Sequence, residues 1–170
     1  MPMPTGHLLA LDAADVKALR AVKGDPKRRT HVKGLLVNAA PPALVGLGDC
    51  WQYLEFLSGK SLFTKGKSLH KGQLCHLVLL DLADLAATVA ALPQDEAGTA
   101  TAFLAIDEAA FAYRYVPFWV KNEWTRDGVK TALTAQQAAK VASALTALRV
   151  FIDHVLGKGL TPLFFCDSHL

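Results

Sequence analysis

The sequence lacks the motifs by which most enzyme families are recognised. Its 170 residues contain no Walker loop, no GxGxxG, no HExxH, no GxSxG and no CxxC pair. Such motifs supply a phosphate cradle, a dinucleotide turn, a zinc site, a nucleophile elbow or a redox thiol pair. We therefore expect no catalytic residue, no cofactor and no metal. An uncharacterised enzyme is only the third alternative for this chain.

Cysteine is scarce, with Cys50, Cys75 and Cys166 as the only three. An odd number without a CxxC pair is typical of a reducing compartment, so we expect free thiols and a cytoplasmic location. Cys50 stands at a predicted helix start, where the dipole lowers a thiol pKa, but the sequence places no histidine beside it. We expect a buried, unreactive thiol there.

The nearest approach to a metal site joins Cys75 and His76 with Cys166 and His169. Cys75 and His76 are consecutive in a predicted strand, so their side chains point to opposite faces of the sheet. His169 lies at a chain end, where residues fray. These features argue against zinc.

Long apolar runs are also missing. The longest uncharged, strongly apolar stretch is Leu77 to Leu80, far short of the roughly 20 residues that cross a bilayer. The first residues lack the apolar run of about seven residues that marks a secretory signal. We expect a soluble protein without a membrane partner.

Apolar residues are nevertheless abundant, at 52% of the chain against 19% charged residues. This composition predicts one compact domain over residues 1–170. Strands are predicted over 8–11, 74–80 and 160–166, and a strand or buried loop over 35–46. Helices are predicted over 12–22, 49–59, 81–92, 95–104, 106–115 and 134–156.

The order of these elements indicates the α+β class. We expect several helices packed on a small mixed sheet, with a long C-terminal helix followed by a terminal strand. Asp12 and Asp81 are expected N-caps, Asp95 is expected to open the next helix, and Thr134 with Gln137 forms a capping box. The aromatic segment around Pro117 is expected to be irregular.

The stretch GDCWQYLEFLSG carries the signals of one short helix, with Asp49 as its cap and Gly59 as its end. Trp51, Leu54 and Leu57 recur at spacings of three and predict one buried stripe. Tyr53 and Phe56 lie off that stripe, so they either widen the buried face or reach a pocket or partner. A helix this short needs burial to form, which favours the core.

Charge is unevenly distributed along the chain. Between Pro26 and Leu80, eight lysines and arginines stand against two acids, in two predicted basic loops at 26–33 and 60–71. The remaining residues are net acidic. The eight cations are candidates for binding an anionic partner, although a solvated face that keeps the protein soluble explains them equally well. They are Lys27, Arg28, Arg29, Lys33, Lys60, Lys65, Lys67 and Lys71.

Four features of the sequence resemble the YfbM-like family of small bacterial proteins. These are the Met-Pro-Met start before an apolar run and a helix, the segment DCWQYLEFLSG, the alanine-rich stretch that ends in Tyr115, Val116 and Pro117, and the long final helix with its terminal strand. The match in the second feature consists of Trp51, Leu54, Ser58 and Gly59. The two lysine-rich stretches are more basic than is typical of the family.

The resemblance implies an intracellular bacterial α+β protein, encoded near toxin genes as an immunity or accessory protein. It brings no catalytic residues with it. Together with the basic segments, it predicts a non-enzymatic protein that occludes a protein partner with an acidic surface. The alternative is binding of nucleic acid or another polyanion by the two basic loops, although Phe63 is the only aromatic there that could stack on a base.

Overall fold

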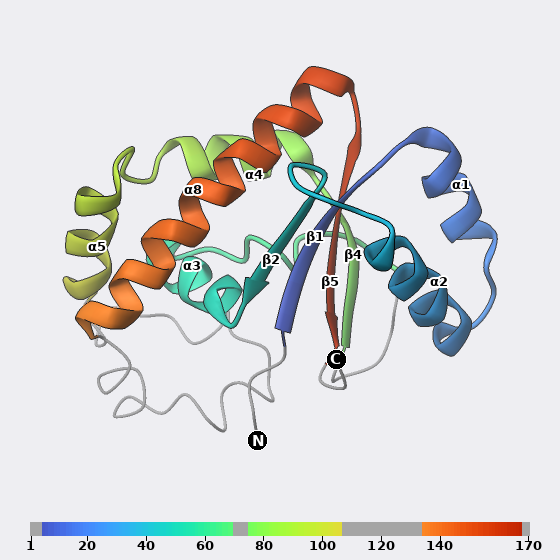
Figure 1. Cartoon of the computed structure of the whole chain (residues 1–170), viewed down its shortest axis with the longest axis horizontal. Helices are drawn as coiled ribbons and strands as arrows, with labels where there is room; N and C mark the ends of the chain where they lie inside the picture. Colours follow the sequence, from blue (N-terminus) through green and yellow to red (C-terminus); the bar gives the residue numbers. More distant parts are fainter. Residues whose placement is uncertain (1–4, 70–74, 107–133, 168–170) are drawn as a thin grey trace.

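The computed structural model describes residues 5–69, 75–106 and 134–167. Five strands form one sheet in the order β2-β1-β5-β4-β3. β5, the last strand of the chain, lies in the middle (Figure 1). The strands are β1 (Thr5–Leu11), β2 (Leu44–Gly48), β3 (Gly66–Ser68), β4 (Cys75–Leu80) and β5 (Thr161–Asp167).

Every pair of neighbouring strands is antiparallel. The α+β class is confirmed, as is the final order of helix then strand, but the expectation of a mixed sheet was wrong. The reason is visible between β1 and β2, because two helices connect them. One helix carries the chain back to the end of the sheet where the first strand began and so gives parallel strands. Two successive helices return the chain to the end at which it left the sheet, so the next strand runs antiparallel.

Helices cover both faces of the sheet, so that the sheet and the two groups of helices form three layers (Figure 1). Adjacent residues of β5 show how each strand serves both sides: Leu163 and Phe165 join one buried cluster, while Phe164 and Cys166 join the other. A strand buried on both faces reads as a continuous apolar run, as the sequence indicated for β4 and β5.

One face of the sheet is covered by α1 (Ala13–Ala21) and α2 (Asp25–Val37). The predicted helix after Asp12 is confirmed, and the Asp12 carboxylate accepts a hydrogen bond from the backbone N–H of Asp15 at 2.7 Å. The predicted basic loop at 26–33 was wrong, because this stretch lies inside α2. Pro26 stands in the first turn of that helix, where its missing N–H costs nothing.

The other face is covered by α3 (Cys50–Ser58), α4 (Leu82–Ala90), α5 (Glu96–Leu104) and α8 (Ala135–Lys158). Asp81 and Asp95 cap α4 and α5 as predicted, each accepting a hydrogen bond from the backbone N–H three residues later. The expected helix 106–115 and the aromatic segment around Pro117 lie outside the described residues.

The helix α3 is part of the core. Its residues Cys50 to Phe56 are all buried, and Tyr53 and Phe56 widen the stripe made by Trp51 and Leu54. Asp49 precedes the helix, but its side chain makes no capping hydrogen bond, so that detail of the prediction was wrong. Gly59 ends the helix with φ 66°, as expected.

Trp51 packs directly on β1 at a glycine. A Cβ atom on Gly6 would lie 2.5 Å from Cδ1 of Trp51 and 2.9 Å from the Phe164 ring, so only glycine leaves room for the indole. The ring centroids of Trp51 and Phe164 are 5.2 Å apart. The tryptophan therefore anchors α3 to the sheet.

The long helix α8 begins as predicted and ends slightly later. The Thr134 hydroxyl accepts a hydrogen bond from the Gln137 N–H at 3.2 Å, but the Gln137 side chain reaches Cys50 and leaves the reciprocal half of the capping box unmade. The helix continues through Gly157 and ends at Gly159, whose φ is 62°.

The stretch after α3 is only partly the exposed loop that the sequence suggested. Leu62 and Phe63 are buried, and the backbone N–H of Phe63 donates to Oε1 of Glu55 at 3.1 Å. The edge strand β3 follows and pairs with β4. A lysine-rich sequence therefore contains a segment that is tied to the core.

Candidate functional site

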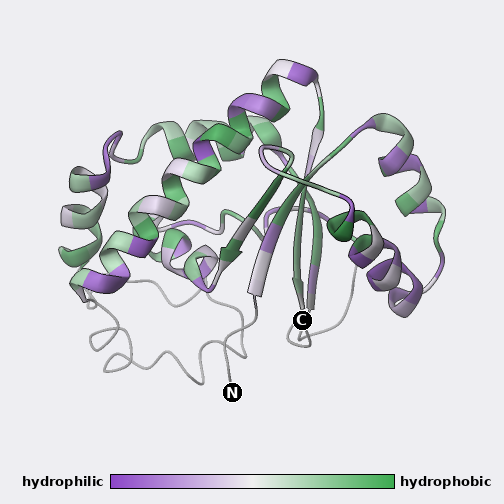
Figure 2. Cartoon of the chain, viewed as in Figure 1, coloured by the Kyte–Doolittle hydropathy of each residue, from purple (hydrophilic) through white to green (hydrophobic). Residues whose placement is uncertain are grey.

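Four of the eight candidate cations lie on α2. They are Lys27, Arg28, Arg29 and Lys33, and the same helix is hydrophilic except at its C-terminal end (Figure 2). Val32 is its only buried residue, so most of the helix surface faces outward. The structure thus gathers on one helix the residues that the sequence placed in a loop.

The candidates from the second basic stretch are divided between the two faces of the sheet. Lys65 pairs with Asp84 of α4 at 3.0 Å and so belongs to the α3–α8 side. Lys67 lies opposite Leu79 in the β3–β4 pair, and Leu79 belongs to the cluster under α1 and α2. Since directly opposite residues share a face, Lys67 lies on the α2 side.

The two remaining candidates do not join this group. Lys60 is exposed immediately after α3, on the opposite side of the sheet from α2. Lys71 lies outside the described residues. The predicted loop 60–71 is therefore not one binding surface.

The helix α1 adds cations that sequence analysis missed. Lys17 and Arg20 are exposed on α1, and Lys23 is exposed in the turn before α2. Over residues 12–37 there are seven lysines and arginines against three aspartates. We call this unit of α1, the turn and α2 the basic layer.

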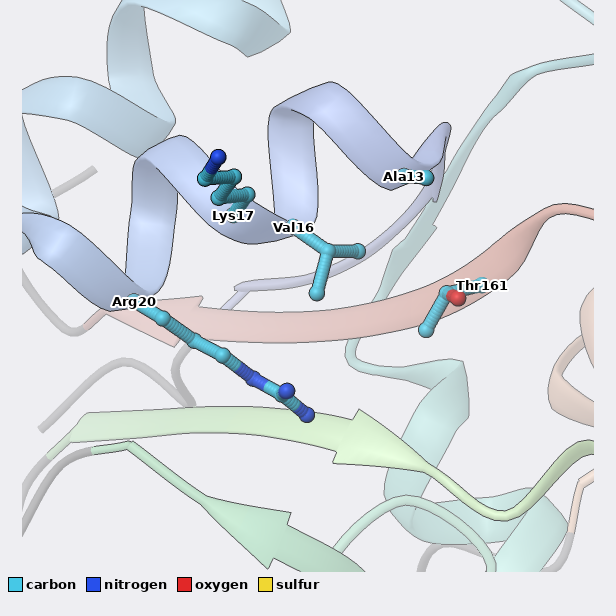
Figure 3. A pocket seen from close by; sticks show the side chains of 5 residues that line it. All are labelled: Ala13, Val16, Lys17, Arg20 and Thr161. Carbon is cyan, nitrogen blue, oxygen red and sulfur yellow. The ribbon is translucent and has the colours of Figure 1, made fainter.

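The basic layer contains an open groove of about 460 Å³ between α1 and the first residue of β5. Ala13, Val16, Lys17 and Arg20 line it from α1, and Thr161 lines it from β5. In Figure 3 the side chains of Val16 and Arg20 extend toward β5, whereas Lys17 points away from that strand. The Arg20 side chain extends from α1 over β5 in the direction of β4 (Figure 3). The i, i+3, i+4, i+7 spacing of the α1 residues is the signal by which the sequence could have shown this face.

The cations of the basic layer differ in what they already bind. Arg28 donates from Nη1 to the carbonyl of Leu69 at 2.8 Å and lies 3.7 Å from the carboxylate of Asp25, so it fastens α2 to the end of β3. Four cations have side chains that make no hydrogen bond or ion pair with other parts of the described chain, namely Lys17, Arg20, Lys23 and Lys27. These four are available to a partner.

Two groups with raised pKa values, the Cys50 thiol and the Glu55 carboxyl, are buried. Burial, followed by the charge of Asp49, raises the pKa of the Cys50 thiol to about 11, which keeps it protonated at neutral pH. Burial raises the pKa of Glu55 to about 8, against the lowering effect of two backbone N–H donors. Both groups lie in the core around α3, away from the groove.

The described residues contain no group of three or more His, Cys, Asp or Glu that could hold a metal ion. Cys166 is buried in the cluster under α3 and α8. The side chain of Cys75 and all of His169 lie outside the described part of the chain, so the sequence-based argument on zinc stays a prediction. Within the described ranges, no helix combines the length and apolarity needed to cross a bilayer.

No protein-family model, curated protein or solved structure matches this chain. The resemblance to the YfbM-like family therefore stays a prediction. Fold and site together define an α+β protein with a three-layer arrangement in which one helical layer is basic.

Proposed function

We propose that this protein is a non-enzymatic binding protein that places its basic layer against an acidic surface of a partner protein and occludes it. Neutralisation of a toxin, as an immunity or accessory protein, is the most concrete form of this function. The observation that carries the proposal is the concentration on one layer of four cations without a partner in the described part of the chain, namely Lys17, Arg20, Lys23 and Lys27.

Charge complementarity makes such a layer effective in recognition. Exposed cations attract an acidic surface during diffusional encounter and discourage partners of the same sign. Since these four cations are not used to hold the fold, their contribution is available to binding.

A tagged protein should recover one stoichiometric partner from its native host. Reversal of Lys23 and Lys27 to glutamate should abolish this recovery, whereas reversal of Lys140 and Lys158 on α8 should leave it intact. Both variants change the net charge equally. Lys27→Glu also puts an acid in the first turn of α2, which the helix dipole favours, so loss of folding is not expected there.

Equal recovery by the two double variants, or recovery of no specific partner by the wild-type protein, would contradict the proposal. Melting curves of all three proteins show whether each is folded. The recovered partner should be identified and its surface charge determined.

Binding of nucleic acid is the second candidate because phosphates also attract unpaired cations. Phe63, the aromatic residue on which base stacking depended in the second basic stretch, is fully buried, which disfavours this alternative. A gel shift at about 50 mM salt that disappears steeply as salt is added would favour it over a protein partner.

A further inference from the structure

The groove of the basic layer, which we call the α1 groove, has a counterpart on the opposite face of the sheet. The second one, of about 360 Å³, lies between α4 and α8 and is lined by Arg149 among other residues. Arg149 donates to the carbonyls of Val89 at 3.2 Å, Leu92 at 3.1 Å and Gln94 at 3.4 Å. Its donors are occupied in completing the end of α4.

Arg20 lines the α1 groove as Arg149 lines the α4–α8 groove, but its guanidinium group makes no hydrogen bond to a carbonyl of the described chain. Neither Arg20 nor Lys17 has a hydrogen-bond or ion-pair partner elsewhere in the described ranges. A guanidinium group offers a planar fork of donors that matches a carboxylate with two parallel hydrogen bonds. The α1 groove therefore has an open anion-binding position that the α4–α8 groove lacks.

The other described residues of the α1 groove are uncharged. Ala13 and Val16 form an apolar stretch, and Thr161 contributes one hydroxyl from β5 (Figure 3). The carboxylate of Asp12 lies next to Ala13, where it caps the helix. The groove is therefore cationic toward Arg20 and apolar toward Ala13, with a negative charge just beyond that end.

We infer that the α1 groove binds an extended segment of the partner protein in which an aliphatic side chain is next to carboxylates. This inference rests on the proposed function. The carboxylates lie at Lys17 and Arg20, and the aliphatic side chain packs on Ala13 and Val16. The groove is open, which suits a passing chain segment, and its volume falls within the range of about 300 to 1000 Å³ that is usual for ligand pockets.

A nucleic-acid strand is a poorer occupant of this groove. Single strands are held by aromatic side chains on which the bases stack, and none of the described residues that line the groove is aromatic. An aliphatic surface next to two cations matches a peptide with leucine and glutamate side chains more closely. The charge of Asp12 further requires the carboxylates to lie away from Ala13.

The test uses a short fluorescein-labelled peptide in which leucine and glutamate alternate, titrated with the full chain at low salt. Fluorescence anisotropy measures binding, and NMR shifts of the backbone amides of Ala13, Val16 and Thr161 locate it. The variant Lys17→Glu with Arg20→Glu should bind at least about tenfold more weakly. A peptide with glutamine in place of glutamate should lose most of its binding to the wild-type protein.

The matched control is Lys140→Glu with Lys158→Glu. It makes the same change in net charge and, like the test variant, removes a cation from the last turn of a helix. It should change the affinity less than about twofold. Lys17→Gln with Arg20→Gln serves as a milder second variant in case the reversal lowers stability.

Each outcome separates this inference from the proposed function. No peptide binding by the wild-type chain, equal weakening in both charge variants, or shifts confined to residues outside the groove would overturn the inference. Should partner recovery still depend on Lys23 and Lys27, the proposed function would stand without the groove. Peptide binding at the groove, combined with partner recovery that ignores Lys23 and Lys27, would overturn only the proposed function.

Discussion

The two faces of the sheet differ in how much they bury. Among the described residues, 24 buried hydrophobic residues form the cluster on the α3–α8 side, and 8 form the cluster under α1 and α2. Of those 8, only Leu19 and Val32 come from helices. The α3–α8 side therefore holds the larger share of the apolar burial that stabilises the fold.

The charges of the two helical layers are reversed. The basic layer has seven lysines and arginines and three aspartates, whereas α3, α4, α5 and α8 with their cap residues have three lysines and arginines and seven acids. The layer that contributes less to the core therefore carries the net positive charge. A surface can be specialised for recognition when stability comes from elsewhere.

The largest expected loss of stability follows the removal of Trp51 from the α3–α8 side. Trp51 is fully buried and contacts Phe164 and His76 at ring-centroid distances of 5.2 Å and 5.9 Å. Trp51→Ala should lower the free energy of unfolding by about 3 to 5 kcal/mol. Denaturant unfolding measures this, and the melting temperature should fall by several degrees or more.

The counterpart of Trp51 on the basic side is Leu19, which is also fully buried. Leu19→Ala should cost less than Trp51→Ala, because its smaller side chain leaves a smaller cavity under a layer that can relax. If Leu19→Ala proved the more damaging change, the assignment of stability to the α3–α8 side would be wrong.

The second effect is a dependence of stability on pH that arises on the α3–α8 side of the sheet. Glu55 is 4% exposed, and burial raises its pKa from 4.5 to about 8. A carboxyl whose pKa is raised by folding stabilises the native state fully below pH 4.5, and this contribution is lost as the pH rises through 8. The loss, which accumulates between pH 4.5 and 8, is on the order of 5 kcal/mol.

Glu55→Gln removes the titration and keeps an oxygen that can accept from the Phe63 N–H. The variant should lose less stability than the wild-type protein between pH 5 and 9, as measured by urea unfolding at several pH values. Subtracting the two curves removes the contribution of His7, whose pKa burial lowers. Parallel curves for the two proteins would show that Glu55 is not the titrating group.

The third prediction compares the arginines of the two grooves. Arg149→Met keeps an aliphatic side chain but removes the hydrogen bonds to the carbonyls of Val89, Leu92 and Gln94, so it should cost about 1 to 3 kcal/mol. Arg20→Met should leave stability nearly unchanged because Arg20 makes no bond in the described chain. Thermal unfolding distinguishes them, and equal losses would contradict the different roles given to the two side chains.

Local signals in the sequence predicted much of the fold. Asp12, Asp81 and Asp95 cap their helices as expected because an N-cap depends only on residues a few positions away. The helix α2 is not predicted by the sequence because the Gly24-Asp25-Pro26 stretch is typical of the end of a helix, although proline is equally at home in a first turn. Its single buried residue, Val32, gives no apolar period by which a helix could be recognised.

The candidate site was only partly predictable for a different reason. The groove joins α1 to Thr161, and that contact follows from the register in which Leu11 lies opposite Thr161. Residues so far apart in the chain meet only through strand pairing, which one sequence does not specify. The same limit explains why Lys65 and Lys67 were expected to act together although the sheet separates them.

The smallest effects are expected for these two lysines, and they test the comparison of the faces most directly. Lys65 pairs with Asp84 with both side chains well exposed, so Lys65→Met should cost under about 1 kcal/mol, with less loss at high salt, and should leave partner recovery unchanged. Lys67→Met should leave stability unchanged and weaken partner recovery, because Lys67 shares the face of the basic layer. Thermal melting and recovery of the partner with both variants decide the matter. If both substitutions weakened recovery equally, the partner would contact both sides of the β3 edge. The assignment of recognition to the basic side and of stability to the α3–α8 side would then be wrong.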